Sequence, residues 1–277
     1  MMELLLGKPI AEKLLRKLGE DIHASHIKPG LAVILIGDDP ASHLYVGLKE
    51  KAAREIGMYF ERHFFSTTDT EENIVETVHT LNQNAGIHGI IVQLPLPNGF
   101  DENRIIEGIL PEKDADGFHP TTLEHYFSGD ESSQPVFPRA VSRLIQSSGQ
   151  SVAGEKGVVL VNSELFGRVM MKTLELLGIR TEIFQYKKWE TERGKLKGAK
   201  VIVTACGVPR LIRSEHLSSG SIIIDGGITR VGDKIFGDVD IVSARDLSGW
   251  IAPVPGGVGP LTVASLLERV VDRALHP

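Results

Sequence analysis

Short runs of apolar residues alternate along the chain with stretches whose apolar residues recur at helical spacing. In the first half, the runs at 31–36, 60–65 and 89–93 predict strands, and the stretches at 42–56 and 71–81 predict helices. Strands that alternate with helices of about ten to fifteen residues indicate βαβ units and a mostly parallel sheet. We therefore predict an α/β domain in this half.

The same alternation resumes in the second half. A polar, turn-forming segment at 127–135 predicts a loop between two units. Beyond it, helices are predicted at 139–145 and 165–177, and strands at 157–161, 181–184, 201–205 and 221–225. This pattern predicts a second doubly wound sheet of the Rossmann type, which is the usual host of a dinucleotide.

The C-terminal stretch at 262–275 has apolar residues at helical spacing and predicts an amphipathic helix. It follows the second sheet, so we expect it to pack back on the first domain. The predicted domains are 1–134 plus 256–277, and 135–255. A ligand is then expected in the interdomain cleft between the two α/β domains.

Composition narrows the functional classes. A length of 277 residues allows two cores, and a net charge of -6 without a basic block indicates a small-molecule substrate rather than nucleic acid. Because Cys206 is the one cysteine, no internal disulfide can form, so we expect a reducing compartment, the cytoplasm. Since no long apolar run is present, we expect neither a membrane span nor a signal peptide, and we assign no metal ligands.

Tyr45 and Lys49 are one helical turn apart and share a helix face. A lysine that is desolvated in a cleft beside a polar neighbour can lose its proton near neutrality and act as an acid or base. The alternative is a solvated lysine on a surface helix, with Leu44, Leu48 and Ala52 as the buried stripe.

Gln93 and the stretch from Asp114 to Phe118 add further polar candidates. Gln93 precedes a Leu-Pro-Leu-Pro run that must leave the sheet, which puts its amide at a carboxyl end where open α/β sheets bind ligands. Asp114 and Asp116 lie in a turn closed by Gly117. One carboxylate could hold a ring with N–H donors, and the alternative is an Asx-turn that satisfies its own backbone.

The most unusual stretch runs from Pro253 to Thr262, with the sequence Pro-Val-Pro-Gly-Gly-Val-Gly-Pro-Leu-Thr. Its glycines allow a ligand to approach bare backbone, and its prolines hold the segment in shape. A purely structural loop would need fewer of these residues.

Together and in this order, these motifs resemble the methylenetetrahydrofolate dehydrogenase/cyclohydrolase family, the FolD-type enzymes. The resemblance covers nearly the whole chain and rests on five motifs: Ala41-Ser42 with Tyr45, Lys49 and Lys51; Val92 to Pro97; Pro111, Lys113-Asp114 and Asp116 to His119; Gly237 to Asp240; and Pro253 to Ala264.

The resemblance implies roles for these residues. Lys49 would be the general acid-base group, Tyr45 and Gln93 would position it and the substrate, and Asp116 would hold the pterin of a tetrahydrofolate derivative. Pro255, Gly256, Gly257 and Val258 would line the folate pocket. The family's reactions imply hydride transfer from 5,10-methylenetetrahydrofolate to a nicotinamide, then hydrolysis to 10-formyltetrahydrofolate, within one-carbon metabolism and purine biosynthesis. The family's habit also implies a homodimer.

The nucleotide half departs from the family pattern. Val161 and Asn162 replace the glycine and arginine expected after the first strand of the second sheet, and Glu164 adds a negative charge. Without that arginine, we expect NADP, with NAD as the alternative, to be bound weakly and to rely on Lys187 and Lys188.

Other loops on the nicotinamide side keep the family pattern. The predicted cofactor contacts are Asn162, Ser163, Lys187, Lys188, Gly207 and Ile228. Three functions stay open at this point: a bifunctional NADP-dependent dehydrogenase/cyclohydrolase, a cyclohydrolase alone, and a non-catalytic folate-binding paralogue.

Overall fold

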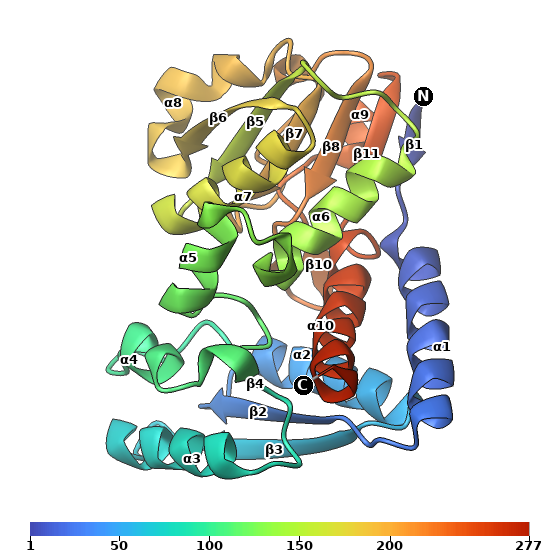
Figure 1. Cartoon of the computed structure of the whole chain (residues 1–277). Helices are drawn as coiled ribbons and strands as arrows, with labels where there is room; N and C mark the ends of the chain where they lie inside the picture. The colour runs from blue at the N-terminus through green and yellow to red at the C-terminus, as the bar shows by residue number, and fades with distance from the viewer. Residues whose placement is uncertain (277) are drawn as a thin grey trace. The chain divides into compact units, whose positions relative to one another are not determined.

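The computed structural model describes residues 1–276, which form two compact units (Figure 1). The three-stranded unit consists of residues 11–136 and the C-terminal segment from Val263. The six-stranded unit consists of Met1–Ile10 and Phe137–Thr262. The helices α1 (Gly7–Ser25), α6 (Val136–Ser147) and α10 (Val258–Leu275) each begin in one unit and end in the other.

The three-stranded unit is built on a parallel sheet with the order β3-β2-β4. The central strand β2 (Gly30–Ile36) is buried throughout, between β3 (Tyr59–Phe65) and β4 (Gly89–Val92). A fully buried strand of continuous apolar residues is typical of a parallel sheet that is covered on both faces.

Side chains of β2 alternate between two cores because successive residues of a strand point to opposite faces. Leu31, Val33 and Leu35 face a core that includes α1, α2 (Pro40–Glu55) and α10. The neighbouring residues Ala32, Ile34 and Ile36 face a second core, shared with α3 (Glu71–Gln83) and α4 (Glu102–Glu107). The unit therefore has three layers.

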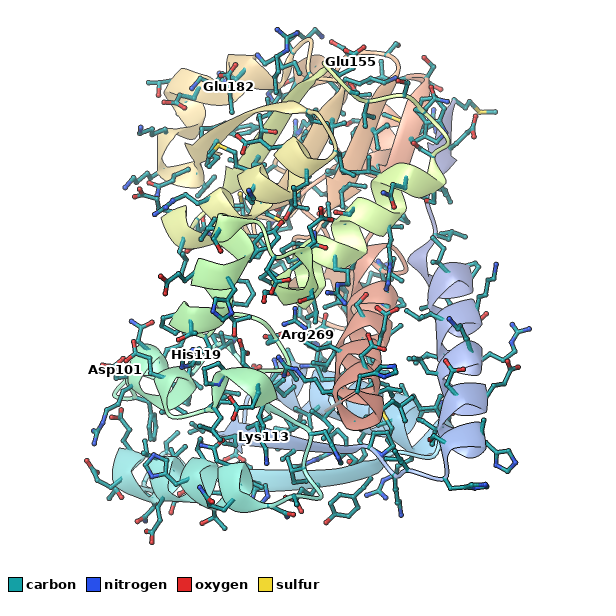
Figure 2. The ribbon with its side chains drawn as sticks, in the orientation of Figure 1. Asp101, Lys113, His119, Glu155, Glu182 and Arg269 are labelled. Atoms are coloured by element: carbon teal, nitrogen blue, oxygen red, sulfur yellow. The ribbon has the colours of Figure 1, made fainter. Side chains whose placement is uncertain are left out.

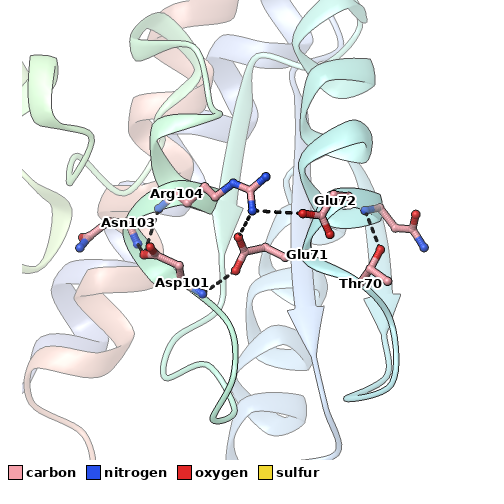
Figure 3. Close-up of polar contacts among 7 residues, drawn as sticks. Thr70, Glu71, Glu72, Asp101, Asn103 and Arg104 are labelled. Atoms are coloured by element: carbon pink, nitrogen blue, oxygen red, sulfur yellow. Dashed lines mark hydrogen bonds and ion pairs between the residues drawn. The ribbon is translucent and has the colours of Figure 1, made fainter.

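The N-termini of α3 and α4 are joined by a polar network (Figure 3). Thr70 and Asp101 cap the two helices by accepting hydrogen bonds from backbone N–H groups of the first turns. Glu71 accepts from the backbone N of Asp101 at 2.6 Å and from Arg104 Nη1 at 2.6 Å. Because Arg104 is about half exposed, we expect these ion pairs to fix the helix ends more than to stabilise the fold.

The chain leaves α4 through a short 3-10 turn, Pro111–Lys113, and then forms α5 (Pro120–Ser128) and a second 3-10 turn, Glu131–Ser133. The segment between Lys113 and Pro120 runs beside β4, where Ala115 N donates to the carbonyl of Ile90 at 3.2 Å. This contact places the Asp-Gly turn next to the carboxyl end of β4.

The six-stranded unit contains a parallel sheet with the order β1-β11-β8-β7-β5-β6. Its strands are β1 (Met2–Leu4), β5 (Lys156–Val161), β6 (Arg180–Gln185), β7 (Val201–Ala205), β8 (Ser221–Asp225) and β11 (Gly249–Ala252). The strand order reverses at β5, since β6 pairs with one of its sides and β7 with the other. Open α/β sheets bind ligands at this kind of switch point.

Helices α6 and α7 (Glu164–Leu176) lie over one face of this sheet (Figure 1). A core of aliphatic and aromatic residues, including Phe184 and Trp189, covers the other face. The remaining elements are the hairpin β9 (Thr229–Val231) and β10 (Lys234–Phe236), the short helices α8 (Trp189–Glu192) and α9 (Ile241–Ala244), and 3-10 turns at Tyr186–Lys188, Arg193–Leu196 and Ser214–His216.

The predicted α/β class with two wound sheets is confirmed, and each predicted strand and helix lies within a few residues of an observed one. The C-terminal helix packs as expected, since Leu267, Val270 and Val271 belong to the core of the three-stranded sheet. The loop predicted at 127–135 is wrong in part, because α5 continues to Ser128 and a 3-10 turn follows. Among residues 1–276, no helix combines the length and hydrophobicity that a membrane crossing requires.

Candidate active site

Helix α2 carries Lys49 on its buried face. The helix begins after Asp39, whose carboxylate accepts from Ser42 N at 2.8 Å. Ser42, Val46 and Ala53 are buried, and Lys49 continues the same stripe at helical spacing. The alternative of a solvated lysine above a Leu44 and Leu48 stripe is wrong, since these two leucines are 48% and 47% exposed.

Lys49 is hydrogen-bonded to Gln93, the residue that follows β4. Its Nζ donates to Gln93 Oε1 at 2.8 Å. The amide of Gln93 is oriented by its other end, because Nε2 donates to the carbonyl of Leu94 at 2.7 Å. Its backbone N still continues the sheet by donating to the carbonyl of Ile34 at 2.9 Å. The structure thus brings together two of the predicted site residues.

The two carboxylates of the Asp-Gly turn have different surroundings. Asp114 is buried, and its two oxygens accept from Gly117 N at 2.9 Å and from His119 N at 2.8 Å. The Asx-turn alternative therefore describes Asp114. With the turn fixed by Asp114, Asp116 is the carboxylate that interacts electrostatically with Lys49.

Gly117 and Arg269 complete this turn. Gly117 has a φ of 89°, and a Cβ there would collide with the guanidinium of Arg269 and with Pro135. Arg269 lies on α10 (Figure 2). It donates to the carbonyls of Ser132, at 3.3 Å, and Gln134. Sequence reasoning missed Arg269, because helical spacing shows only that it lies on α10.

Burial shifts the pKa values of three titratable site residues, Lys49, Asp116 and Tyr45. Desolvation lowers the pKa of Lys49, and the charge of Asp116 partly offsets this shift. Desolvation raises the pKa of Asp116, which Lys49 and Arg269 oppose and Asp114 reinforces. Desolvation also raises the pKa of the Tyr45 phenol, one helical turn before Lys49. An amine whose pKa is lowered in this way can give and accept a proton closer to neutral pH.

A small cavity of about 20 Å³ lies beside the turn. Its apolar walls come from β4 and from Ile106 and Ile109, and its polar wall includes Asp114 and Asp116. A cavity of this size accommodates about one water molecule, provided polar partners are present. Of the candidate site residues, Asp116 lines this cavity, and Lys49 and Gln93 do not.

The glycine-rich loop belongs to the six-stranded unit. Gly256 has a φ of 101°, and its carbonyl accepts from Gly7 N at 3.0 Å. Gly257 N donates to the carbonyl of Pro253 at 2.7 Å, and a Cβ on Gly257 would collide with that carbonyl. A Cβ on Gly259 would meet nothing within 4 Å. Loop geometry thus accounts for Gly256 and Gly257 but not for Gly259.

The predicted phosphate-side residues lie at the switch point of the six-stranded sheet. Asn162 follows β5, and its Nδ2 donates to the carbonyl of Cys206, after β7, at 2.7 Å. Ser163 caps α7 by accepting from Phe166 N at 3.3 Å. A Cβ on Gly167 would press against Ile183, as expected of a glycine that brings a helix close to its strands.

The other predicted cofactor contacts lie in loops at the same sheet edge. Lys187 and Lys188 are exposed just after β6, and Lys188 pairs with Glu192 at 3.7 Å. Gly207 follows β7 and Ile228 follows β8, and both are exposed. These positions match the strand ends at which a Rossmann fold contacts its dinucleotide.

Comparison with known proteins identifies the family. Residues 5–116 match the catalytic domain described as tetrahydrofolate dehydrogenase/cyclohydrolase, and residues 135–276 match the NAD(P)-binding domain of that description. The bifunctional protein FolD of Moorella thermoacetica is 37% identical over 276 residues, which are 98% of each chain. The chain belongs to the tetrahydrofolate dehydrogenase/cyclohydrolase family. The resemblance that the motifs carry is therefore confirmed.

Solved structures of family members share the fold. The bifunctional FolD enzyme of Campylobacter jejuni aligns with a TM-score of 0.92 at 36% identity and covers 99% of both chains. The Trypanosoma brucei enzyme, complexed with NADP and an inhibitor, aligns with a TM-score of 0.93 at 29% identity, over 98% of this chain and 97% of that one. The individual site residues stay predictions, which the observed contacts of Lys49 and Gln93 support.

Proposed function

We propose that this protein oxidises 5,10-methylenetetrahydrofolate with NADP and hydrolyses the resulting methenyl compound to 10-formyltetrahydrofolate. The observation that carries the proposal is the partly buried Lys49 amine, which is hydrogen-bonded to Gln93 and interacts with the charge of Asp116. It lies within the segment that matches the family's catalytic domain, in a chain that also matches the NAD(P)-binding domain. The family supports both activities.

The two steps act on one carbon atom. In the first, a hydride leaves the carbon that bridges N5 and N10, which becomes a methenyl cation. In the second, the oxygen of water adds to that carbon, the bond to N5 breaks, and the formyl group stays on N10 while a proton is released. NADP, when bound, supplies the hydride acceptor for the first step.

Lys49 would move the proton in the hydrolytic step. Water must lose protons as its oxygen bonds to the methenyl carbon, and an amine with a lowered pKa is a suitable acceptor. The oxygen of Gln93 would hold this amine in place in either protonation state, because both forms of an amine can donate to it. Tyr45, on the same helix, would help to orient the substrate.

Asp116 would bind the pterin ring. A carboxylate is a strong acceptor for the ring's N–H donors. Burial raises the pKa of Asp116, and the positive groups Lys49 and Arg269 counteract this shift in favour of the charged form. The glycine-rich loop, Pro255 to Val258, would line the folate pocket, and the open space at Gly259 supports ligand approach there. The functional domains proposed from the sequence, a folate domain of 1–134 plus 256–277 and a nucleotide domain of 135–255, differ from the compact units at both ends, because Met1–Ile10 and residues 256–262 belong to the six-stranded unit.

The residues at the switch point fit NADP, with fewer phosphate contacts than expected. The N-terminus of α7, capped by Ser163, is suited to a diphosphate, and Lys187 and Lys188 lie near the ribose-reading position. Val161 is a buried strand residue, and the amide of Asn162 already bonds Cys206. NADP would therefore be held weakly, chiefly by the lysines.

The alternatives of a cyclohydrolase alone and of a non-catalytic paralogue are not favoured, because relatives over the full chain are bifunctional enzymes. We further propose a homodimer in the cytoplasm that supplies formyl units for purine biosynthesis.

Two absorbance assays on one purified sample test the function. The first follows NADPH formation from 5,10-methylenetetrahydrofolate, and the second follows loss of the methenyl compound without nucleotide. Both activities are expected. Hydrolysis without NADPH formation would show that the protein is a cyclohydrolase alone. If neither activity is detected, the protein would be a non-catalytic folate-binding paralogue.

A further inference from the structure

The Gly237 to Asp240 motif contains a carboxylate that is fully buried in the six-stranded unit. Asp238 is 0% exposed and accepts three hydrogen bonds. They come from Thr204 Oγ1 at 2.7 Å, Cys206 N at 2.7 Å and Val208 N at 2.9 Å. All three donors lie at the end of β7 or in the loop after it, so Asp238 binds the backbone on both sides of Gly207.

A second buried carboxylate ties the motif to the next strand. Asp225 ends β8, is 0% exposed, and accepts from Gly227 N at 3.0 Å, Asp238 N at 3.0 Å and Val239 N at 2.9 Å. The loops after β7 and β8 are thereby joined through one segment. Two of the donors, the N–H groups of Cys206 and Val208, flank Gly207. Two others, the N–H groups of Asp238 and Val239, follow Gly237. The N–H group of Gly227 lies in the loop that contains Ile228.

The packing of the two carboxylates is reciprocal. A Cβ on Gly227 would collide with the carboxylate of Asp238, and a Cβ on Gly237 would collide with that of Asp225. The carboxylate of Asp238 thus packs against Gly227, two residues after Asp225, and the carboxylate of Asp225 packs against Gly237, the residue before Asp238. Such an arrangement leaves little freedom for either loop.

We propose that Asp238 is a positioning residue for hydride transfer, because its carboxylate fixes the backbone around Gly207 at the nicotinamide end of the dinucleotide site. This inference rests on the proposed function. Asp238 itself is buried and would not touch the cofactor. Its effect would pass through the loop of Cys206 to Val208, which Asn162 also holds from the β5 side.

The need for a carboxylate follows from the donors. An ionised carboxylate accepts with both oxygens, whereas an asparagine amide would present an NH₂ group to at least one backbone N–H. That N–H would lose its partner and the loop would shift, because buried donors are rarely left unpaired. The adenosine end of the dinucleotide would be unaffected, since Lys187 and Lys188 lie after a different strand.

Asp238→Asn is the decisive variant. We expect kcat/KM for NADP in the dehydrogenase assay to fall about tenfold, which corresponds to about 1.4 kcal/mol. Cyclohydrolase activity and the inhibition constant of 2′,5′-ADP should change by less than about twofold. Asp240→Asn is the matched control, since Asp240 belongs to the same motif but caps α9 by accepting from Ser243 N at 3.3 Å. It should leave both activities unchanged.

Thr204→Val is the second variant, and it removes one side-chain donor while keeping every backbone N–H. It should reproduce the NADP defect to a smaller degree, and it decides the question if Asp238→Asn does not fold. An unchanged kcat/KM for NADP, or an equal loss of both activities and of 2′,5′-ADP binding, would overturn the inference. If the unmodified enzyme forms no NADPH, the proposed function fails first, and the inference fails with it.

Discussion

Lys49 donates a 2.8 Å hydrogen bond to the amide oxygen of Gln93, a residue 44 positions further along the chain. One partner lies on the buried face of α2 and the other follows the last residue of β4. Because the NH₂ group of Gln93 is bound to the carbonyl of Leu94, its oxygen is the atom presented to the amine. The site thus fixes the position of Lys49 without requiring that it be charged.

Replacement of Lys49 by Met should lower the cyclohydrolase kcat by about 10²- to 10⁴-fold, which is the range that a general acid-base group contributes. Methionine keeps the apolar stem of the side chain, so folate binding and thermal unfolding should be nearly unchanged. The decay of methenyl absorbance measures the loss. Lys51→Met is the control, because Lys51 is exposed on the same helix. A Lys49→Met enzyme that hydrolyses at the parental rate would disprove the assignment.

Replacement of Asp116 by Ala should chiefly raise the KM for folate in both reactions. A carboxylate that accepts hydrogen bonds from the pterin stabilises the ground and transition states alike, so kcat should change less than KM. Since the charge of Asp116 raises the pKa of Lys49, its loss should also move the pH–rate profile of hydrolysis to lower pH. Glu112→Gln, in the exposed turn before it, is the control. A fall in kcat alone would contradict a binding role.

The sequence was sufficient to predict most helices and strands, because buried strands are local features. Its resemblance to a family, rather than a local pattern, singled out the residues around Lys49, and their roles stay predictions. The sequence could not decide which stripe of α2 is buried. Both the Leu44 and Leu48 stripe and the Ser42, Val46 and Lys49 stripe have helical spacing, and only packing against the sheet exposes the leucines.

Contacts between segments that are far apart in the chain also could not be predicted from the sequence. The pairing of β1 with β11 brings Met2 beside Gly249, and no local pattern at the N-terminus indicates it. Arg269 and Asp238 are two further examples, since each is charged and reads as a surface residue until its partners are known. Arg269 donates to backbone carbonyls, and Asp238 accepts from two backbone N–H groups as well as from the Thr204 hydroxyl, and sequence motifs do not display such partners.

Replacement of both Lys187 and Lys188 by Ala should weaken NADP binding about tenfold or more. Lysine supplies charge without the bidentate geometry of arginine, so the attraction should also fall as salt concentration rises. Titration of NADP at low and high salt measures both effects. Lys195→Ala is the control, since Lys195 is already paired with Glu192 at 2.8 Å. Tight binding that ignores both substitutions would show that other residues hold the 2′-phosphate.

The last prediction concerns Asp225, whose pKa is raised to about 7, mainly by burial and further by the charge of Asp238. Its three backbone hydrogen bonds act in the opposite direction and lower the pKa. With an ordinary value of 3.8 in the unfolded chain, the folded protein binds an additional proton between the two values. The free energy of unfolding should therefore decrease as pH rises from about 4 to about 7 and should not change further through this group above that range.

Denaturant unfolding of the unmodified chain and of Asp225→Asn, each at about pH 5 and about pH 8, isolates this contribution. The variant loses the titrating group, so its stability should fall less between the two pH values, whatever its absolute stability. Asp246→Asn is the control, because Asp246 is exposed and should leave the pH dependence unchanged. Equal pH dependence in the unmodified chain and in Asp225→Asn would mean that Asp225 stays ionised throughout, with its hydrogen bonds from Gly227, Asp238 and Val239 outweighing the cost of burial.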